Sequence, residues 1–155
     1  MSIVRNGFVV FMVAAGLLAA PSARADDPIR DIVEQPVPTM TDGTKIPIGE
    51  VQRALLQALI RHKFDATTVA PGHITAKFAR RFSSFEVDIQ YTETSYSVRY
   101  RDSKRMDYDA GRQRIDESYN EQLVQLGAQV QDQFDTVLRR MKRIAQKQTR
   151  RSLKV

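Results

Sequence analysis

The hydrophobic residues of this chain change their spacing twice, and this change constrains the fold more than any other feature. Within residues 48–63, Val51, Leu55 and Leu59 recur every four residues, which predicts an amphipathic helix. Over residues 64–101, apolar and polar residues alternate, which predicts β-strands separated by short turns. A second helical pattern then fills the end of the chain. We therefore expect an α+β fold.

The alternating region predicts an antiparallel meander of three or four strands. The expected strands cover residues 64–69, 74–79, 85–91 and 96–101. Pro71 and Gly72 mark the first turn between them. One face of this meander is apolar. The other face is polar with charges of both signs, and it carries Lys77, Glu86, Asp88, Gln90, Arg99 and Arg101.

A long helix is expected to close the chain. Its apolar residues follow one another at gaps of three and four, as one face of a helix requires: Tyr119, Leu123, Leu126, Val130, Phe134, Val137, Met141 and Ile144. We expect this helix to pack beside the first one on the apolar face of the sheet, which gives a two-layer sandwich. The stripe ends at Ile144, so the last turns are expected to fray.

The first 25 residues predict a cleavable signal peptide. Arg5 supplies a positive start, residues 7–20 are apolar and uncharged, and Ala23 and Ala25 are the small residues that signal peptidase recognises. The alternative is a membrane anchor, but the apolar stretch is shorter than the roughly 20 residues that span a bilayer. We therefore expect cleavage after Ala25 and a periplasmic or secreted product.

Four units are expected along the chain: a signal peptide (1–25), a linker (26–47), a single α+β domain (48–145) and a basic tail (146–155). The linker is inferred from its four prolines, which forbid a regular helix: Pro28, Pro36, Pro38 and Pro47. The chain has no cysteine. It can therefore form neither a disulfide nor the lipid anchor of a lipoprotein, and its core must be held by packing alone.

The charge of the chain is divided unevenly. Residues 26–135 carry 14 Lys and Arg against 18 Asp and Glu, whereas residues 136–155 carry eight basic side chains and no acidic one. The basic residues are Arg139, Arg140, Lys142, Arg143, Lys147, Arg150, Arg151 and Lys154. Such a run can contact anionic lipid or lipopolysaccharide, or it can be a solvated helix end whose cations complement the helix dipole. Because export is expected, we expect no nucleic-acid partner.

Catalytic and metal-binding patterns are absent from the sequence, so we expect no cofactor, no metal and no enzyme activity. The only histidines, His62 and His73, are expected to be exposed and apart, and no nucleophile elbow or phosphate-binding glycine loop occurs. A small hydrolase remains a weaker alternative because four carboxylates lie close together in sequence: Asp107, Asp109, Asp116 and Glu117. Acidic residues at a helix start are, however, expected for the dipole alone.

The loop expected over residues 102–114, together with the helix start after it, is the best candidate for a binding surface. Long loops in small domains often carry function, and this region holds Ser103, Met106, Tyr108, Tyr119 and Asn120. The alternative is structural. In that interpretation the apolar and aromatic residues close one end of the core, and Ser103 and Asn120 cap turns or helices.

This region also resembles a group of small bacterial envelope proteins and lipoproteins. The run YSVRYRDSKRMDY (96–108) is similar to the pattern Y-x-I-x-Y-x-x-S-x-x-L-x-Y of that group, and residues 115–123 are similar to its I-H-x-x-Y-N-x-W motif and the start of its closing amphipathic helix. The resemblance covers about residues 48–135 and implies the fold and an envelope location, with no activity attached. The chain has Asp116 where the group often has His, and Gln122 where it often has Trp.

Two functions are therefore expected ahead of any enzyme. The first is a non-catalytic periplasmic binding or interaction protein that uses the loop or the polar sheet face against a protein partner or an envelope component. The second is a protein that associates with the envelope surface through its basic tail.

Overall fold

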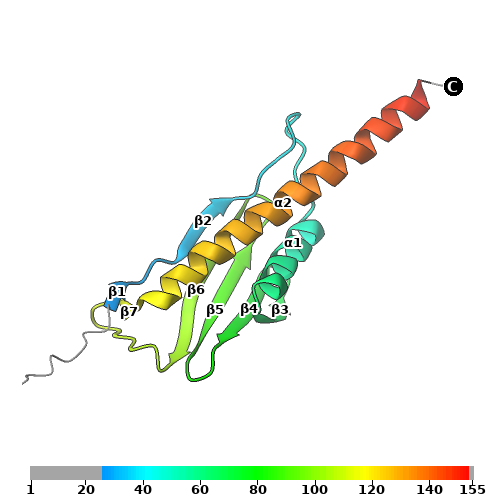
Figure 1. Ribbon diagram of the computed structural model, residues 1–155. Helices are drawn as coiled ribbons and strands as arrows, with labels where there is room; N and C mark the ends of the chain where they lie inside the picture. The colour runs from blue at the N-terminus through cyan, green and yellow to red at the C-terminus, as the bar shows by residue number, and fades with distance from the viewer. Residues whose placement is uncertain (1–25, 154–155) are drawn as a thin grey trace, which may run out of the picture.

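The computed structural model describes residues 26–153 and has the α+β fold that the sequence predicts (Figure 1). Two helices, α1 (Ile48–Arg61) and α2 (Glu117–Ser152), lie side by side on one face of a five-stranded antiparallel sheet. The expected signal peptide and its cleavage site after Ala25 lie outside the described residues.

The sheet has the strand order β2-β6-β5-β4-β3, in which the last four strands are the predicted meander. Its strands are β2 (Ile32–Pro36), β3 (Asp65–Ala70), β4 (His73–Ala79), β5 (Ser84–Tyr91) and β6 (Ser95–Lys104). The register places Ile74, Ile89 and Val98 side by side across three strands. All three are fully buried, because they face the helices.

Aromatic rings join the sheet to α2 along the length of the core. The ring of Phe85 in β5 meets that of Tyr119 at a centroid distance of 5.0 Å, and the ring of Tyr96 in β6 meets that of Phe134 at 5.8 Å. Both pairs are edge-to-face, the arrangement that aromatic quadrupoles favour. Burying each such side chain contributes about 1.5–3 kcal/mol. The core is therefore the apolar stripe of α2 set against the sheet.

The segment 26–47 was expected to be a linker outside the domain, either extended over it or mobile; it is extended, but it forms part of the domain. It contributes β2 to the main sheet, and β1 (Asp26–Pro28) pairs with β7 (Arg114–Asp116) in a small second sheet. Its prolines do forbid a regular helix. An edge strand nevertheless tolerates Pro36, because one side of such a strand has no neighbouring strand that would need a backbone N–H donor from it. Val37 and Ile46 are both buried in the core.

Two further boundaries differ from the prediction. The expected loop 102–114 is shorter, because β6 continues to Lys104 and β7 begins at Arg114. The basic tail expected over residues 146–155 is helical as far as Ser152, where α2 ends. Ala, Gln, Lys and Arg are strong helix formers, and extending an existing helix needs no new nucleus.

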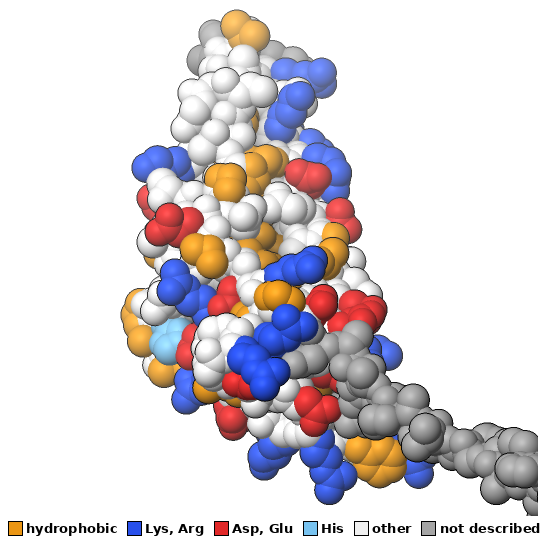
Figure 2. All heavy atoms as spheres, turned by 90° about the vertical axis from the view of Figure 1, so that its left-hand side faces the viewer, with side chains coloured by type: hydrophobic (Ala, Val, Ile, Leu, Met, Phe, Trp, Pro, Cys, Tyr) orange, Lys and Arg blue, Asp and Glu red, His pale blue; other side chains and the backbone are white. Residues whose placement is uncertain are grey.

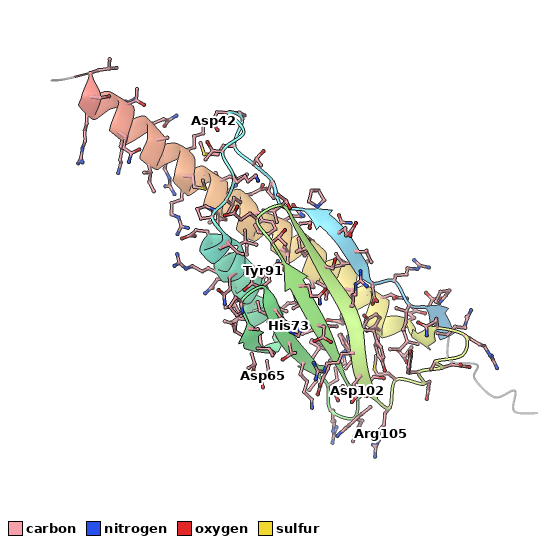
Figure 3. All side chains as sticks on the ribbon, turned by 180° about the vertical axis from the view of Figure 1, so that it is seen from behind. Asp42, Asp65, His73, Tyr91, Asp102 and Arg105 are labelled. Atoms are coloured by element: carbon pink, nitrogen blue, oxygen red, sulfur yellow. The ribbon has the colours of Figure 1, made fainter. Side chains whose placement is uncertain are left out.

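The second face of the sheet is covered by no element of residues 26–153 (Figure 3). It carries the polar residues that the alternation predicts, and His73 lies on it (Figure 3). No helix in the described part of the chain is long and apolar enough to span a membrane.

Candidate functional site

The five residues proposed as a binding surface do not form an open surface. Met106, Tyr119 and Asn120 are buried, with Tyr119 fully inaccessible. Ser103 and Tyr108 are half-buried. The hydroxyl groups of Ser103 and Tyr100 lie 2.9 Å apart, and the Tyr108 ring packs on that of Tyr100 at a centroid distance of 4.3 Å. These contacts order the chain after β6.

Tyr119 holds the N-terminal segment to the core. Its hydroxyl group donates to the Asp31 carboxylate at 2.6 Å, and the same carboxylate oxygen accepts the backbone N–H of Tyr100 at 3.0 Å. Burial raises the pKa of the Tyr119 phenol, and the hydrogen bond to Asp31 raises it further. The phenol therefore stays protonated and acts as a donor. Asp31 could not be recognised from the sequence because it lies in the supposed linker.

Asn120 makes a second attachment one residue later. Its side-chain amide donates to the carbonyl oxygen of Pro28 at 2.9 Å, and its side-chain oxygen accepts the N–H of Arg30 at 2.9 Å. The backbone N–H of Ile29 also reaches the carbonyl oxygen of Gln113 at 2.9 Å. We call residues 26–36 the N-terminal strap. Tyr119 and Asn120 stabilise this strap, and their polar groups are occupied within the fold.

The two histidines are only partly exposed, contrary to the expectation that both would be exposed. His62 lies 2.9 Å from the side-chain oxygen of Gln122 and stacks on Phe64 and Phe78. His73 lies 2.8 Å from the carboxylate of Asp88. Within residues 26–153, no group of three His, Cys, Asp or Glu side chains could hold a metal ion. Both rings have structural partners.

The open sheet face carries a ladder of alternating charges. Asp88 accepts from His73 and, at 3.0 Å, from Arg101. Glu86 lies 3.4 Å from Lys77 and 3.9 Å from Arg101. Burial alone would raise the pKa of Asp88, but the hydrogen bonds from His73 and Arg101 outweigh it and lower the pKa. Most of the charges on this face are therefore paired with one another, and Arg99 is an exposed cation beside them.

Two of the four carboxylates considered for a hydrolase, Asp109 and Asp116, make structural contacts, and the other two, Asp107 and Glu117, are exposed. Asp116 caps α2, because its side chain accepts the N–H of Ser118 at 3.0 Å. Asp109 accepts the N–H of Arg112 at 3.0 Å and pairs with the Arg112 guanidinium at 3.2 Å. These contacts give the two carboxylates roles in ordering the turn and starting the helix.

A cleft of about 320 Å³ lies between the N-terminal strap and α2. Ile32 and Val124 supply apolar walls, and Gln131 donates weakly to the Tyr96 hydroxyl group at 3.5 Å. Gly127 faces Ile32 so closely that a Cβ there would lie 3.5 Å from the Ile32 Cδ1 atom. The cleft has room for a small apolar group but brings no nucleophile and base together.

The C-terminal end of α2 is the most unusual surface of the molecule. Residues 142–153 are all exposed, so the helix continues about 16 Å beyond the last residue that packs on the body. Figure 1 shows that this end of α2 extends beyond the sheet and α1. Arg139, Arg143, Lys147 and Arg151 recur every four residues, so they share one side of the helix. We call these four residues the basic stripe.

Most cations of this helix end have no acidic partner. Arg140 pairs with Glu50 of α1, and Arg139 donates to the Thr136 hydroxyl at 3.0 Å. Among the residues that the structure describes, no acidic side chain pairs with the remaining basic residues of the predicted set, which are Lys142, Arg143, Lys147, Arg150 and Arg151. Their charges are therefore available to a ligand.

The helix dipole does not explain the basic stripe. Cations complement the dipole only within the last turn, which holds Arg150 and Arg151. Arg139 and Arg143 lie two or more turns earlier. Like charges four residues apart instead destabilise a helix by about 0.2–0.5 kcal/mol per pair. The stripe contains three such pairs, so it costs stability and contributes nothing to the core.

Comparison with protein-family models, with curated proteins and with solved structures finds no match to this chain. The resemblance to small envelope proteins therefore stays a prediction, and the function has to be inferred from the geometry.

Proposed function

We propose that the protein is a non-catalytic binding protein of the cell envelope that attaches to an anionic surface through the basic stripe of α2. The observation that carries this proposal is the row of cations on a helix end that packs against nothing within residues 26–153. A projecting helix can lie along a surface without disturbing the core, and each Lys or Arg near an anionic membrane contributes about 1 kcal/mol.

The rest of the molecule supports this assignment. Most charges of the open sheet face are paired with one another, and most of the proposed loop residues are buried, so neither region offers a row of unpaired charges. The expected export places anionic phosphate groups, on phospholipid or lipopolysaccharide, within reach of the protein. The ligand chemistry is therefore a phosphate-rich surface.

The test is co-sedimentation with vesicles of phosphatidylethanolamine with and without phosphatidylglycerol, and in parallel with lipopolysaccharide aggregates. The variant Arg143→Gln, Lys147→Gln, Arg151→Gln should bind anionic vesicles on the order of 100-fold more weakly than the unaltered chain. A matched control replaces three exposed cations elsewhere, Lys45→Gln, Arg61→Gln and Arg99→Gln. This control should lose much less affinity because its charges are scattered.

Salt provides the second readout. The screening length falls from about 8 Å at physiological ionic strength to about 3 Å at 1 M, so binding should weaken steeply as salt rises. Tighter binding either to the phosphatidylglycerol vesicles or to the lipopolysaccharide aggregates identifies the source of the phosphate. Equal loss of affinity in the stripe variant and the control would contradict the proposal.

A protein partner is the second candidate, and the uncovered sheet face favours it. This face is polar and uncovered, and it includes Arg99 and Gln90, which are exposed. Crosslinking in intact cells through a photoreactive residue at position 90 should capture a defined protein if the face is an interface. The same label at position 153, directly after α2, is the control.

A further inference from the structure

The turn between β4 and β5 forms a basic and aromatic tip at the opposite end of the molecule from the basic stripe (Figure 1). Residues 80–83 connect the two strands, and the N–H of Arg80 donates to the carbonyl oxygen of Ser83 at 2.8 Å. We call these four residues the hairpin tip. The hydrogen bond across the turn gives the tip a defined shape.

Phe82 is exposed at the hairpin tip between cations. It is 67% exposed, and the Arg81 guanidinium carbon lies 5.1 Å from the centre of its ring. The Arg80 guanidinium lies over the ring of Phe78 at 5.8 Å. Among residues 26–153, neither arginine has an acidic partner within ion-pair distance. The unpaired guanidinium of Arg81 therefore lies against the exposed ring of Phe82, and that of Arg80 lies over Phe78 and lines the same cleft as Phe82.

The neighbouring turn adds a further cation. Arg105 lies with Arg80 and Phe82 along one cleft of about 470 Å³, whose lining also includes the carboxylates of Asp107 and Asp116. Figure 3 shows Arg105 beside the turn between β4 and β5 at the end of the sheet. The φ angle of Arg105 is 54°, in the region that non-glycine residues seldom adopt. Figure 2 shows basic side chains and an exposed hydrophobic side chain together at this lower end of the molecule.

We propose that the hairpin tip is a second contact with an anionic lipid bilayer, in which Phe82 enters the headgroup and acyl boundary while Arg80, Arg81 and Arg105 meet lipid phosphates. A soluble polyanion would satisfy the cations but offers no apolar interior to Phe82, whereas a bilayer interface offers both. The inference rests on the proposed function for the sign of the surface, and it concerns a different end of the molecule.

The chain has no tryptophan, so Phe82→Trp introduces a single fluorescent reporter at the tip. On addition of vesicles of phosphatidylethanolamine and phosphatidylglycerol, its emission should shift to the blue and become protected from iodide quenching. Val69→Trp is the matched control, because Val69 is also exposed but lies on β3 away from the tip. The control should show neither change. An unshifted, fully quenchable reporter at position 82 on chains that have bound would overturn the inference.

A second variant separates this contact from the role of α2. Phe82→Ser should reduce binding to anionic vesicles about tenfold, because the exposed ring no longer partitions into the interface. Its binding to soluble polyphosphate should be unchanged. If the Phe82→Trp reporter shifts while the α2 stripe variant binds normally, the tip is a contact and the proposed role of α2 fails. If Phe82→Ser binds vesicles as well as the unaltered chain does, the tip inference fails alone.

Discussion

At the residue scale, Tyr119 and Asn120 make two attachments that fix the N-terminal strap. They are neighbours in the first turn of α2, and each reaches a segment about 90 residues earlier in the chain. Both side chains are buried, so water cannot replace a lost partner without opening the contact. The strap therefore depends on two polar side chains as well as on the pairing of β2 with β6.

We expect Tyr119→Phe to lower the free energy of unfolding by about 1–2 kcal/mol, because the carboxylate of Asp31 loses a short hydrogen bond. Amide hydrogen exchange should speed up in β1 and β2 more than in β4 and β5. Tyr108→Phe is the control, since the Tyr108 hydroxyl group only accepts from Gln113 at 3.4 Å. Unchanged exchange in the strap would show that backbone pairing alone holds it.

The lowered pKa of Asp88 predicts how the stability of the protein depends on pH. Its lowered pKa means that the folded state favours the carboxylate, so its contribution to stability is present above the pKa of the unfolded chain, about 3.9. The contribution is lost as the pH falls through the still lower pKa of the folded state. Asp88→Asn should therefore be less stable than the unaltered chain at pH 7, by about 1 kcal/mol or less for so exposed a site.

The difference in free energy of unfolding between the two chains should shrink as the pH falls below about 4. Urea denaturation at pH 7, 5, 3 and 2 measures it. Glu93→Gln is the control, because Glu93 is exposed and has no hydrogen-bond or ion-pair partner among residues 26–153. A difference that stays constant with pH would mean that the hydrogen bonds from His73 and Arg101 do not depend on the charge of Asp88.

At the element scale, α2 has two parts with opposite demands. Its first part buries an apolar stripe from Tyr119 to Val137 and needs only the core. Its last part accepts repulsion between cations four residues apart, which weakens the helix locally. One continuous helix therefore connects a part that packs on the sheet to a part whose basic composition the core does not require.

We expect Lys147→Glu to strengthen the end of α2 and to weaken its binding to anionic vesicles. The substitution turns two repulsive pairs, with Arg143 and Arg151, into attractive ones of about 0.2–0.5 kcal/mol each. Amide exchange in residues 142–152 should therefore slow down while affinity falls. Lys45→Glu makes the same charge change in the loop before α1. This control should leave amide exchange in α2 unchanged and should lower the affinity much less than Lys147→Glu does. A helix end that is no better protected would contradict the repulsion argument.

At the scale of the whole molecule, the two proposed contacts lie at opposite ends of an elongated domain (Figure 1). The body between them has its charges largely paired across the open sheet face and the helices. A molecule with two such ends can engage two surfaces at once. The spacing between those surfaces would be set by the rigid length of the sheet and α2.

The protein should therefore cluster anionic vesicles, seen as a rise in light scattering at ratios where free vesicles remain. Phe82→Ser and the stripe variant should each still bind at high lipid concentration but cluster less, because each retains one contact. Vesicles without phosphatidylglycerol are the control and should not cluster. Saturating binding without any clustering would mean that both ends lie on the same bilayer.

The sequence alone determined the local elements, because hydrophobic period is a property of neighbouring residues. It identified both helices, all four strands of the meander and the basic run, and it singled out Tyr119 and Asn120 as unusual. It placed residues 26–47 outside the domain as a linker. Prolines show that a segment cannot form a helix, but they do not show which distant strand the segment will pair with.

Only the tertiary structure decided what these unusual residues do. Tyr119 meets Asp31 across 88 residues, and no local pattern encodes a contact of that separation. The hairpin tip likewise has the sequence of a plain turn, although the run Arg-Arg-Phe is visible in it. Whether a side chain is buried or exposed depends on how the helices pack on the sheet. That packing separates residues that stabilise the fold from residues that remain free to bind.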